Sequence, residues 1–298
     1  MANISAKDVQ ALRERTGVGM MKCKEALIAT EGDMEKAVTF LREQGLAVAA
    51  KKATRIAAEG IISLYCENNV GVLVEVNSET DFVAKNPSFK EFADGVAKVI
   101  AENNPADVAA LLDMKFPGTE LTVEEMRKEK VLVIGENLNI RRFAREEGAT
   151  FCYSHGNGRI GVLVKFDSEG NGDFATNAKN VCMQIAALTP AYMTKEDVPA
   201  EIIESEKEIL LSQIKNDPKQ ANKPQQVIDK MITGKLSKYY TENVLLEQGF
   251  FFDDTITVGK ALAAAGLNLV TYTRFEKGEG LQKREDNFAA EVAAAMSK

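Results

Sequence analysis

Apolar residues recur every three or four positions through the first part of the chain, a spacing that predicts amphipathic helices. Residues 5–45 carry this pattern with interruptions, the clearest at residues 16–19, and we expect three short helices there. Ser5 followed by Asp8 three positions later is typical of a capped helix start. Gly45 is the expected end of the third helix, because glycine commonly follows the last helical residue. The pattern therefore predicts a small three-helix bundle at the beginning of the chain.

Beyond this bundle the pattern changes to apolar runs bounded by turn residues, and it occurs twice. The run Gly-Val-Leu-Val begins at Gly71 and again at Gly161, each time as the second half of an expected hairpin. A helix and a further strand follow each hairpin, and Ser88 with Glu91 is the expected capping box of the first helix. The hairpins are expected at 60–76 and 150–166, the helices at 89–100 and 178–188, and the closing strands at 139–143 and 269–273. Two related units with antiparallel sheets and helices give an α+β fold.

The second unit is interrupted by a helical stretch rich in charged residues. Residues 199–215 and 227–232 predict two helices that a proline-containing turn joins into a hairpin. The apolar stripe of each helix is expected to pack against another apolar surface. Either the two helices cover each other, or the hairpin is a surface for self-association, and the pattern does not decide between these interpretations.

The last residues of the chain have helical spacing as well. Residues 280–298 predict an amphipathic helix, with Phe288, Val292 and Met296 four positions apart along one side. This side is expected to dock either on the core of the same chain or on a partner protein.

Composition and charge narrow the class of protein. The 298 residues, 45% hydrophobic and 27% charged, have the composition of an ordinary globular protein of about two domains. The net charge of -7 is uneven, because residues 1–55 carry +3, residues 56–140 carry -8 and the rest carry -2. An acidic balance argues against direct nucleic-acid binding and favours a protein partner. With no apolar run of membrane-spanning length and no signal-peptide pattern, we expect a cytoplasmic protein without membrane contact.

Residues that could carry enzyme chemistry are scarce. The single histidine, His155, precedes a Gly-Asn-Gly turn, so zinc sites of the usual Cys/His spacing cannot be built. The four cysteines are far apart in the sequence and form no C-x-x-C pair: Cys23, Cys66, Cys152 and Cys182. No glycine-rich phosphate loop is present. We therefore expect no catalytic residue, no metal site and no cofactor.

Two short segments suggest contact with another protein. The first contains Val18, Gly19, Met20 and Met21, and the second contains Thr80, Asp81, Phe82 and Val83. Methionines at an interhelical loop either fill the core or contact a partner. In the second segment, Thr80 or Asp81 is expected to cap a helix, and Phe82 either packs into the core as a hydrophobic staple or serves a function.

Taken as longer strings, both segments resemble the bacterial translation elongation factor Ts family. Residues 12–27, Leu-Arg-Glu-Arg-Thr-Gly-Val-Gly-Met-Met-Lys-Cys-Lys-Glu-Ala-Leu, look like its N-terminal signature. Residues 79–86, Glu-Thr-Asp-Phe-Val-Ala-Lys-Asn, look like its second signature, and the resemblance covers essentially the whole chain. It implies a guanine-nucleotide exchange factor for elongation factor Tu, the GTPase that delivers aminoacyl-tRNA. Such a factor works without covalent chemistry.

The resemblance also implies an organisation and a set of contact residues. It implies a ubiquitin-associated-like (UBA-like) bundle with its linker at 1–55, core units at 56–147 and 148–279, a coiled-coil dimerisation insertion at 190–230 and a C-terminal module at 280–298. Thr80, Asp81, Phe82 and Val83 would wedge into Tu and dislodge its Mg²⁺, and the partner-binding residues would be Val18, Gly19, Met20, Met21, Phe288, Val292 and Met296. In the second unit the matching Asp173-Phe174 follows two extra residues in a glycine-containing stretch, so we expect no magnesium role there.

Two other functions remain as alternatives. A dimeric scaffold that uses the three-helix bundle as an adaptor would bind partners without affecting nucleotide release. An enzyme that uses His155 is disfavoured, because the residue lies at a turn and the sequence offers no matching partner.

Overall fold

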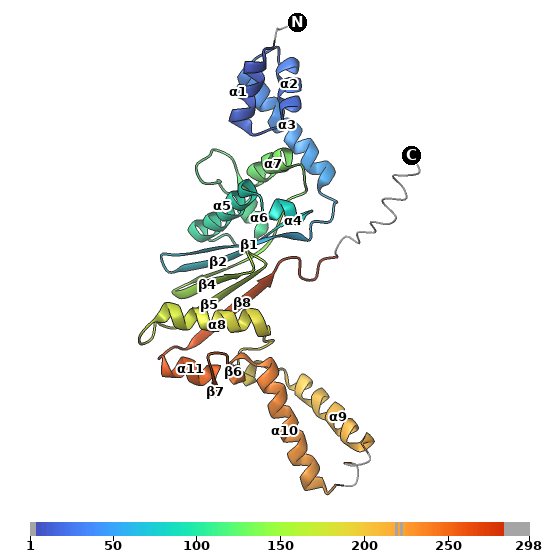
Figure 1. The fold of residues 1–298 in the computed structure, drawn as a ribbon, viewed down its shortest axis with the longest axis vertical. Helices are drawn as coiled ribbons and strands as arrows, with labels where there is room; N and C mark the ends of the chain where they lie inside the picture. The colour runs from blue at the N-terminus through green and yellow to red at the C-terminus, as the bar shows by residue number, and fades with distance from the viewer. Residues whose placement is uncertain (1–3, 218–219, 221–222, 283–298) are drawn as a thin grey trace.

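The computed structural model describes residues 4–217, 220 and 223–282. Its elements are stacked along one long axis, with a helical bundle at one end and a helical hairpin projecting from the other (Figure 1). Two antiparallel sheets lie between these ends and face each other, and helices cover the outer face of each sheet. The α+β class predicted from the sequence is confirmed.

Three helices form the N-terminal bundle: α1 (Ala6–Thr16), α2 (Met20–Ala29) and α3 (Met34–Lys52). The Ser5–Asp8 capping box is present at the start of α1. The expected end at Gly45 is wrong, because α3 continues through that residue to Lys52. A Cβ at Gly45 would lie 3.5 Å from the backbone oxygen of Lys128 and 3.7 Å from Leu132. The glycine therefore serves close packing between α3 and a helix of the first unit rather than helix termination.

The first unit contains a three-stranded sheet in the order β1-β2-β3, with helices on one face. Its elements are β1 (Glu59–Glu67), β2 (Val70–Ser78), α4 (Asp81–Ala84), α5 (Pro87–Asn103), α6 (Val108–Leu112), α7 (Val123–Ile134) and β3 (Asn139–Glu147). Asn86, not Ser88, caps α5, because its side chain accepts a hydrogen bond from the Ser88 backbone N–H. The expected Ser88–Glu91 capping box is therefore wrong, and Pro87 occupies the first turn of the helix.

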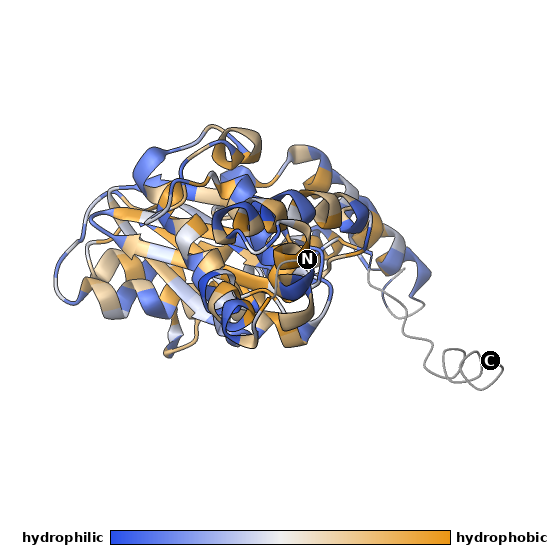
Figure 2. Cartoon of the chain, turned by 90° about the horizontal axis from the view of Figure 1, so that it is seen from above, coloured by the Kyte–Doolittle hydropathy of each residue, from blue (hydrophilic) through white to orange (hydrophobic). Residues whose placement is uncertain are grey.

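The second unit repeats this arrangement with the sheet order β4-β5-β8. Its elements are β4 (Ala149–His155), β5 (Ile160–Phe166), α8 (Phe174–Leu188), α9 (Ala200–Asn216), α10 (Gln225–Asn243), β6 (Gly249–Phe250), β7 (Asp253–Thr257), α11 (Val258–Ala264) and β8 (Leu269–Glu276), with short 3₁₀ turns at Lys195–Asp197 and Leu245–Glu247. Helix α8 packs on β4 and β5 as α5 packs on β1 and β2. Both predicted hairpins and both closing strands are present. Hydropathy colouring shows helices that are orange and blue along their length, as expected for helices with one buried side (Figure 2).

The two sheets approach each other closely because each contributes a glycine to the contact. A Cβ added at Gly71 would collide with Leu163, and one added at Gly161 would collide with Ile62. Gly161 also faces Leu73, so the glycine of each repeat lies against the leucine two positions after the glycine of the other repeat. Ile62, Leu73, Leu163 and Phe275 form the buried cluster between the sheets. The Ile62 backbone N–H donates to the Gly158 carbonyl at 2.7 Å and adds a direct hydrogen bond between the units.

A carboxylate is buried near the end of the first sheet. Glu75 is 0% exposed, and it accepts hydrogen bonds from Arg142 at 2.7 Å and from Arg141 at 3.1 Å. Its other partners are the Asn77 side chain at 3.0 Å and the Gly278 backbone N–H at 2.8 Å. Glu75 therefore ties β2 and β3 to the segment that follows β8. Burial by itself raises the pKa of Glu75, but the hydrogen bonds from Asn77, Gly278 and Arg142 outweigh it, so the pKa of this carboxyl lies below its ordinary value.

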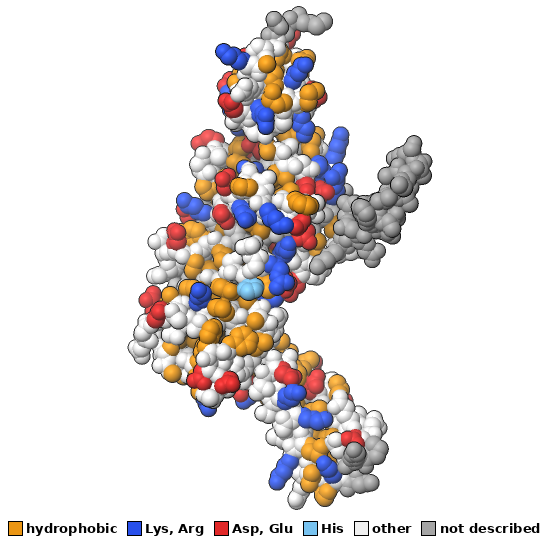
Figure 3. Space-filling view, viewed as in Figure 1, with side chains coloured by type: hydrophobic (Ala, Val, Ile, Leu, Met, Phe, Trp, Pro, Cys, Tyr) orange, Lys and Arg blue, Asp and Glu red, His pale blue; other side chains and the backbone are white. Residues whose placement is uncertain are grey.

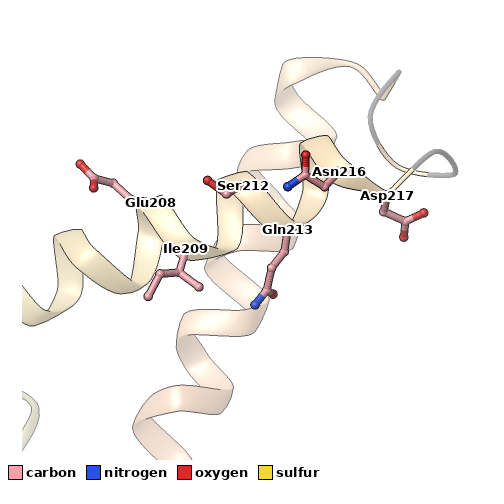
Figure 4. A pocket seen from close by; sticks show the side chains of 6 residues that line it. All are labelled: Glu208, Ile209, Ser212, Gln213, Asn216 and Asp217. Carbon is pink, nitrogen blue, oxygen red and sulfur yellow. The ribbon is translucent and has the colours of Figure 1, made fainter.

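The helical hairpin of α9 and α10 interrupts the second unit, and α10 continues to Asn243, beyond the expected limit at residue 230. Ile214 and Ile228 are the buried residues of the two helices. Three large apolar side chains stay exposed: Ile202, Ile209 and Val227. Figure 4 shows Ile209 with Gln213 and other polar residues along an open hollow on α9. The two helices thus cover part of their apolar surface and leave part uncovered.

Among the described residues, no helix is long and apolar enough to cross a membrane. The expected C-terminal helix, with Phe288, Val292 and Met296, lies outside the described residues.

We predict that replacing Glu75 with glutamine lowers the free energy of unfolding at pH 7 by about 3 kcal/mol, because two guanidinium groups lose their buried anion. A carboxyl with a depressed pKa stabilises the fold above its ordinary pKa, and this contribution is lost as the pH falls through the folded-state value. The wild-type protein should therefore lose stability below about pH 4.5 more steeply than Glu75→Gln. Urea unfolding followed by circular dichroism between pH 7 and pH 3 measures both effects.

Glu67→Gln is the matched control, since Glu67 lies exposed at the end of the neighbouring strand. Equal pH dependence of Glu75→Gln and the wild type would show that Glu75 does not stabilise the fold through its charge.

Candidate protein-interaction site

The one-turn helix α4 presents an exposed aromatic ring between β2 and α5. Phe82 is 78% exposed, whereas its neighbours Val83 and Ala84 are buried in the core of the first unit. The staple interpretation of Phe82 is therefore wrong, because the turn is oriented with Val83 toward the core and Phe82 toward the surface. An exposed phenylalanine on a firmly packed turn is suited to contact another molecule.

Thr80 holds the start of this turn against the loop between α7 and β3. Its backbone N–H donates to one carboxylate oxygen of Glu136 at 2.9 Å, and its hydroxyl donates to the other at 2.6 Å. Thr80 occupies the N-cap position of α4, but its side chain makes no cap hydrogen bond, because the hydroxyl is directed to Glu136. The neighbouring Glu79 accepts from the Asn137 backbone N–H at 2.6 Å and pairs with Arg55 at 3.4 Å. The turn is thus fixed at its first residues by two carboxylates.

Asp81 and Lys85 flank the exposed ring. The Lys85 ammonium lies 2.7 Å from the Asp81 carboxylate and 5.7 Å from the centroid of the Phe82 ring. The hydrogen bond from Lys85 lowers the pKa of Asp81. Because both charged groups are largely exposed, the pair can open and re-form with a partner at little cost. The surface of the turn therefore offers one apolar ring with one anion and one cation beside it.

The corresponding residues of the second unit are arranged differently. Phe174 contacts Phe166 edge to face, with ring centroids 5.6 Å apart, and packs against the core of its unit. Asp173 caps α8 by accepting from the Thr176 backbone N–H at 3.0 Å. Of these two related phenylalanines, the first is therefore largely exposed, whereas the second is half-buried against its own unit.

The other predicted contact residues lie elsewhere in the structure. Val18 is 3% exposed and packs in the core of the N-terminal bundle, whereas Met20 and Met21 are 41% and 69% exposed at the start of α2. Gly19 is the N-cap of α2, and a Cβ there would meet nothing within 4 Å. The bundle is joined to the first unit by α3, which packs on α7, and by the ion pair of Arg42 with Glu129. Its methionines and the Phe82 turn are thus two separate surfaces (Figure 1).

His155 does not form a catalytic constellation. It is exposed at the end of β4, and the single histidine is visible at the surface of the second unit (Figure 3). Its Nδ1 lies 3.1 Å from the Tyr153 hydroxyl, the one side-chain hydrogen bond found for it. In the described part of the chain, no three histidine, cysteine or acidic residues gather in a way that could hold a metal ion.

Sequence reasoning missed Glu136, which anchors Thr80, and Glu75, which anchors the end of the sheet. The sequence contains one indication of the role of Glu75, because a charged residue inside the apolar run Val-Leu-Val-Glu-Val is unusual in a buried strand. Glu136 gave none, because it lies fifty-six residues from Thr80 in an ordinary polar stretch.

We predict that Glu136→Ala loosens the Phe82 turn without unfolding the protein. Loss of the charge-assisted bond should accelerate hydrogen exchange at the Thr80 amide roughly tenfold, equivalent to about 1.4 kcal/mol. Hydrogen exchange read by NMR or mass spectrometry measures this rate. Glu91→Ala, which removes an exposed carboxylate from α5, is the control, and unchanged exchange at Thr80 in Glu136→Ala would contradict the anchoring role.

Comparison with known proteins gives one consistent family. The sequence profile of the family described as Elongation factor TS matches residues 79–279. The chain is 46% identical to Elongation factor Ts of Syntrophotalea carbinolica over 98% of both chains, and 44% identical to that of Halothermothrix orenii over 99% of both. It is 46% identical to Elongation factor Ts of Clostridium perfringens over 99% of this chain and 100% of that protein.

Proposed function

The chain belongs to the elongation factor Ts family, and we propose that it is the guanine-nucleotide exchange factor for the translational GTPase elongation factor Tu. It would bind Tu in the GDP-bound form, accelerate GDP release and leave the nucleotide site open for GTP. The observation that carries the proposal is the exposed Phe82 on a turn anchored by Thr80 and Glu136.

In this proposal, Thr80, Asp81, Phe82 and Val83 form a wedge that disturbs the Mg²⁺ site of Tu. The Mg²⁺ of a GTPase contacts nucleotide phosphates and neutralises their charge, so moving its ligands weakens nucleotide binding. Phe82 supplies apolar volume on a side chain with few rotamers to restrict. Asp81 supplies a carboxylate beside it, and the buried Val83 holds the turn in place.

Exchange requires coupling between two binding events. If the wedge weakens nucleotide binding to Tu, nucleotide weakens binding of this chain to Tu by the same factor. A weakening of about 10⁴-fold corresponds to about 5.5 kcal/mol of differential interaction, more than one phenylalanine supplies. We therefore propose an extended interface, in which Met20 and Met21 of the bundle add a second apolar contact with the nucleotide domain of Tu.

The units would divide the contacts between them. The bundle with its linker (1–55) and the first unit (56–147) would hold the nucleotide domain of Tu, and the second unit (148–279) would hold another domain. The C-terminal module (280–298) would contribute Phe288, Val292 and Met296. The half-buried Phe174 supports the absence of a second wedge, since its ring packs on Phe166.

The wedge is tested by following the release of a fluorescent GDP analogue from Tu. We predict that Phe82→Ala slows the stimulated release about tenfold or more, the equivalent of about 1.4 kcal/mol of transition-state stabilisation, while thermal stability stays unchanged because the ring is exposed. Phe174→Ala is the matched control in the second unit. It should lower the thermal stability, because that ring packs on the core, and leave exchange by the folded protein intact.

Wild-type protein that binds Tu without accelerating release would contradict the exchange function and support the adaptor alternative. Full activity of Phe82→Ala would keep the exchange function and contradict the wedge.

We also propose that the helical hairpin mediates self-association. Ile202 and Ile209 lie seven residues apart on α9 and both are exposed, as is Val227 on α10. Seven residues are two helical turns, so Ile202 and Ile209 share one side of the helix. A second copy of this hairpin would cover the apolar surface that the two helices leave open.

The double variant Ile202→Glu with Ile209→Glu should shift the protein from dimer toward monomer in sedimentation velocity and retain GDP release, because the wedge lies in the first unit. Glu208→Ala, on the same helix, controls for a general effect of substitution. Parallel loss of exchange and self-association would place the hairpin in the Tu interface instead.

A further inference from the structure

Two cysteines that are far apart in the sequence meet between the two sheets. Cys66 lies near the end of β1 in the first unit, and Cys152 lies in β4 of the second. The Cys152 thiol donates to the carbonyl of Tyr65, the residue before Cys66, at 3.4 Å. The Cys66 thiol in turn faces the carbonyl of Thr150, two residues before Cys152, at 4.0 Å. Each sulfur thus lies against the backbone beside the other cysteine.

The two thiols differ in access and in acidity. Cys66 is exposed and Cys152 is half-buried. The Cys152 S–H donates to the Tyr65 carbonyl while Cys66 is neutral, and it is also the nearby donor that stabilises the Cys66 thiolate. It lowers the pKa of Cys66 to about 7, so Cys66 is partly thiolate at neutral pH. The role of donor to Cys66, together with burial and the negative charge on Cys66, raises the pKa of Cys152. One partner is therefore a nucleophile open to solvent, and the other is a protonated thiol held next to it.

The remaining cysteines are closed to solvent. Cys23 and Cys182 are buried in the cores of the bundle and the second unit. Burial raises the pKa of Cys182 well above its ordinary value, which suppresses its thiolate. Reactive thiol chemistry in the described residues is thus confined to one place, the contact of β1 with β4.

We propose that Cys66 and Cys152 form a peroxide-sensitive redox pair whose disulfide joins the two core units. The Cys66 thiolate attacks a hydroperoxide such as H₂O₂, the O–O bond breaks, and Cys66 becomes a sulfenic acid while hydroxide leaves. The sulfur of Cys152 then attacks the Cys66 sulfur and forms the S–S bond. The hydroxyl of the sulfenic acid leaves and takes up the Cys152 proton as water. In sum, two thiols and one H₂O₂ give one disulfide and two waters, and a dithiol reductant restores the pair.

The second step is assisted by the first. Once Cys66 is a neutral sulfenic acid, the negative charge that opposed ionisation of Cys152 is gone, which favours attack by the Cys152 sulfur. The bond would lie beside the Ile62–Leu73–Leu163–Phe275 cluster and would fasten β1 to β4. It would thereby fix the two units against each other, independently of the exchange function proposed above. Disulfides of this kind in reducing compartments are transient and serve as sensors.

Mass spectrometry of the full-length chain tests the pair directly. The reduced protein is treated with H₂O₂, blocked with N-ethylmaleimide and digested with trypsin. We expect a monomer lighter by two hydrogens and a cross-linked peptide pair, residues 56–85 joined to residues 146–159, that disappears on reduction. Sulfinic acid at Cys66 with free Cys152, an intermolecular Cys66 disulfide, or no oxidation at all would overturn the proposal.

The rate at which Cys66 is alkylated tests whether Cys152 activates it, and this measurement does not require oxidation. With iodoacetamide at pH 7, Cys66 should react about tenfold more slowly in Cys152→Ala than in the wild type, because the thiolate loses its hydrogen-bond donor. Cys152→Ser, which retains a donor, should recover part of the rate. Cys23 and Cys182 stay unmodified in folded protein and report unfolding in any variant. Equal rates in all three proteins would show that Cys152 does not activate Cys66.

Discussion

The close approach of two sheets governs the architecture of this protein. Each sheet brings a glycine to the contact, and Gly71 and Gly161 leave the space that Leu163 and Ile62 fill. A methyl group at either glycine would push the sheets apart, and the cluster that they share is small. The larger cores lie outside this contact, between each sheet and its helices. Corresponding positions of the two repeats meet across the contact, so both repeats use the same pairing of a glycine with a large apolar side chain of the other sheet.

The exposed turn depends on this arrangement through short chains of polar contacts. Strand β2 contributes Gly71 to the contact between the sheets and Glu75 to the buried charge network, and it ends just before Thr80. Glu136 then fixes Thr80, and Val83 and Ala84 enter the core of the first unit. Phe82 is therefore exposed on a well-anchored support, which would lower the entropy lost if it entered a partner as proposed. A rigid apolar side chain on a fixed turn is what a wedge requires.

Local signals in the sequence predicted much of the fold, and distant contacts account for what they missed. Hairpins and amphipathic helices follow from spacing within a few residues, and the Ser5–Asp8 cap is local as well. The prediction that α3 ends at Gly45 was wrong, because this glycine is needed for close packing against α7, which lies far along the chain. The sequence could not predict whether Phe82 is buried or exposed, because an apolar residue after a helix cap is compatible both with a hydrophobic staple and with a surface contact. Glu136 and the meeting of Cys66 with Cys152 depend on tertiary structure, for which the linear pattern carries no signal.

In the proposed function, the anchored Phe82 turn couples binding of this chain to release of nucleotide from Tu. The most direct measurement compares the affinity of the wild type and Phe82→Ala for nucleotide-free Tu and for GDP-bound Tu. Because coupling is reciprocal, we predict that the substitution weakens binding to nucleotide-free Tu much more than binding to GDP-bound Tu. The dissociation constant for GDP-bound Tu, divided by that for nucleotide-free Tu, should therefore become smaller. An equal loss of affinity for both forms would show that Phe82 only binds Tu, and would contradict the account.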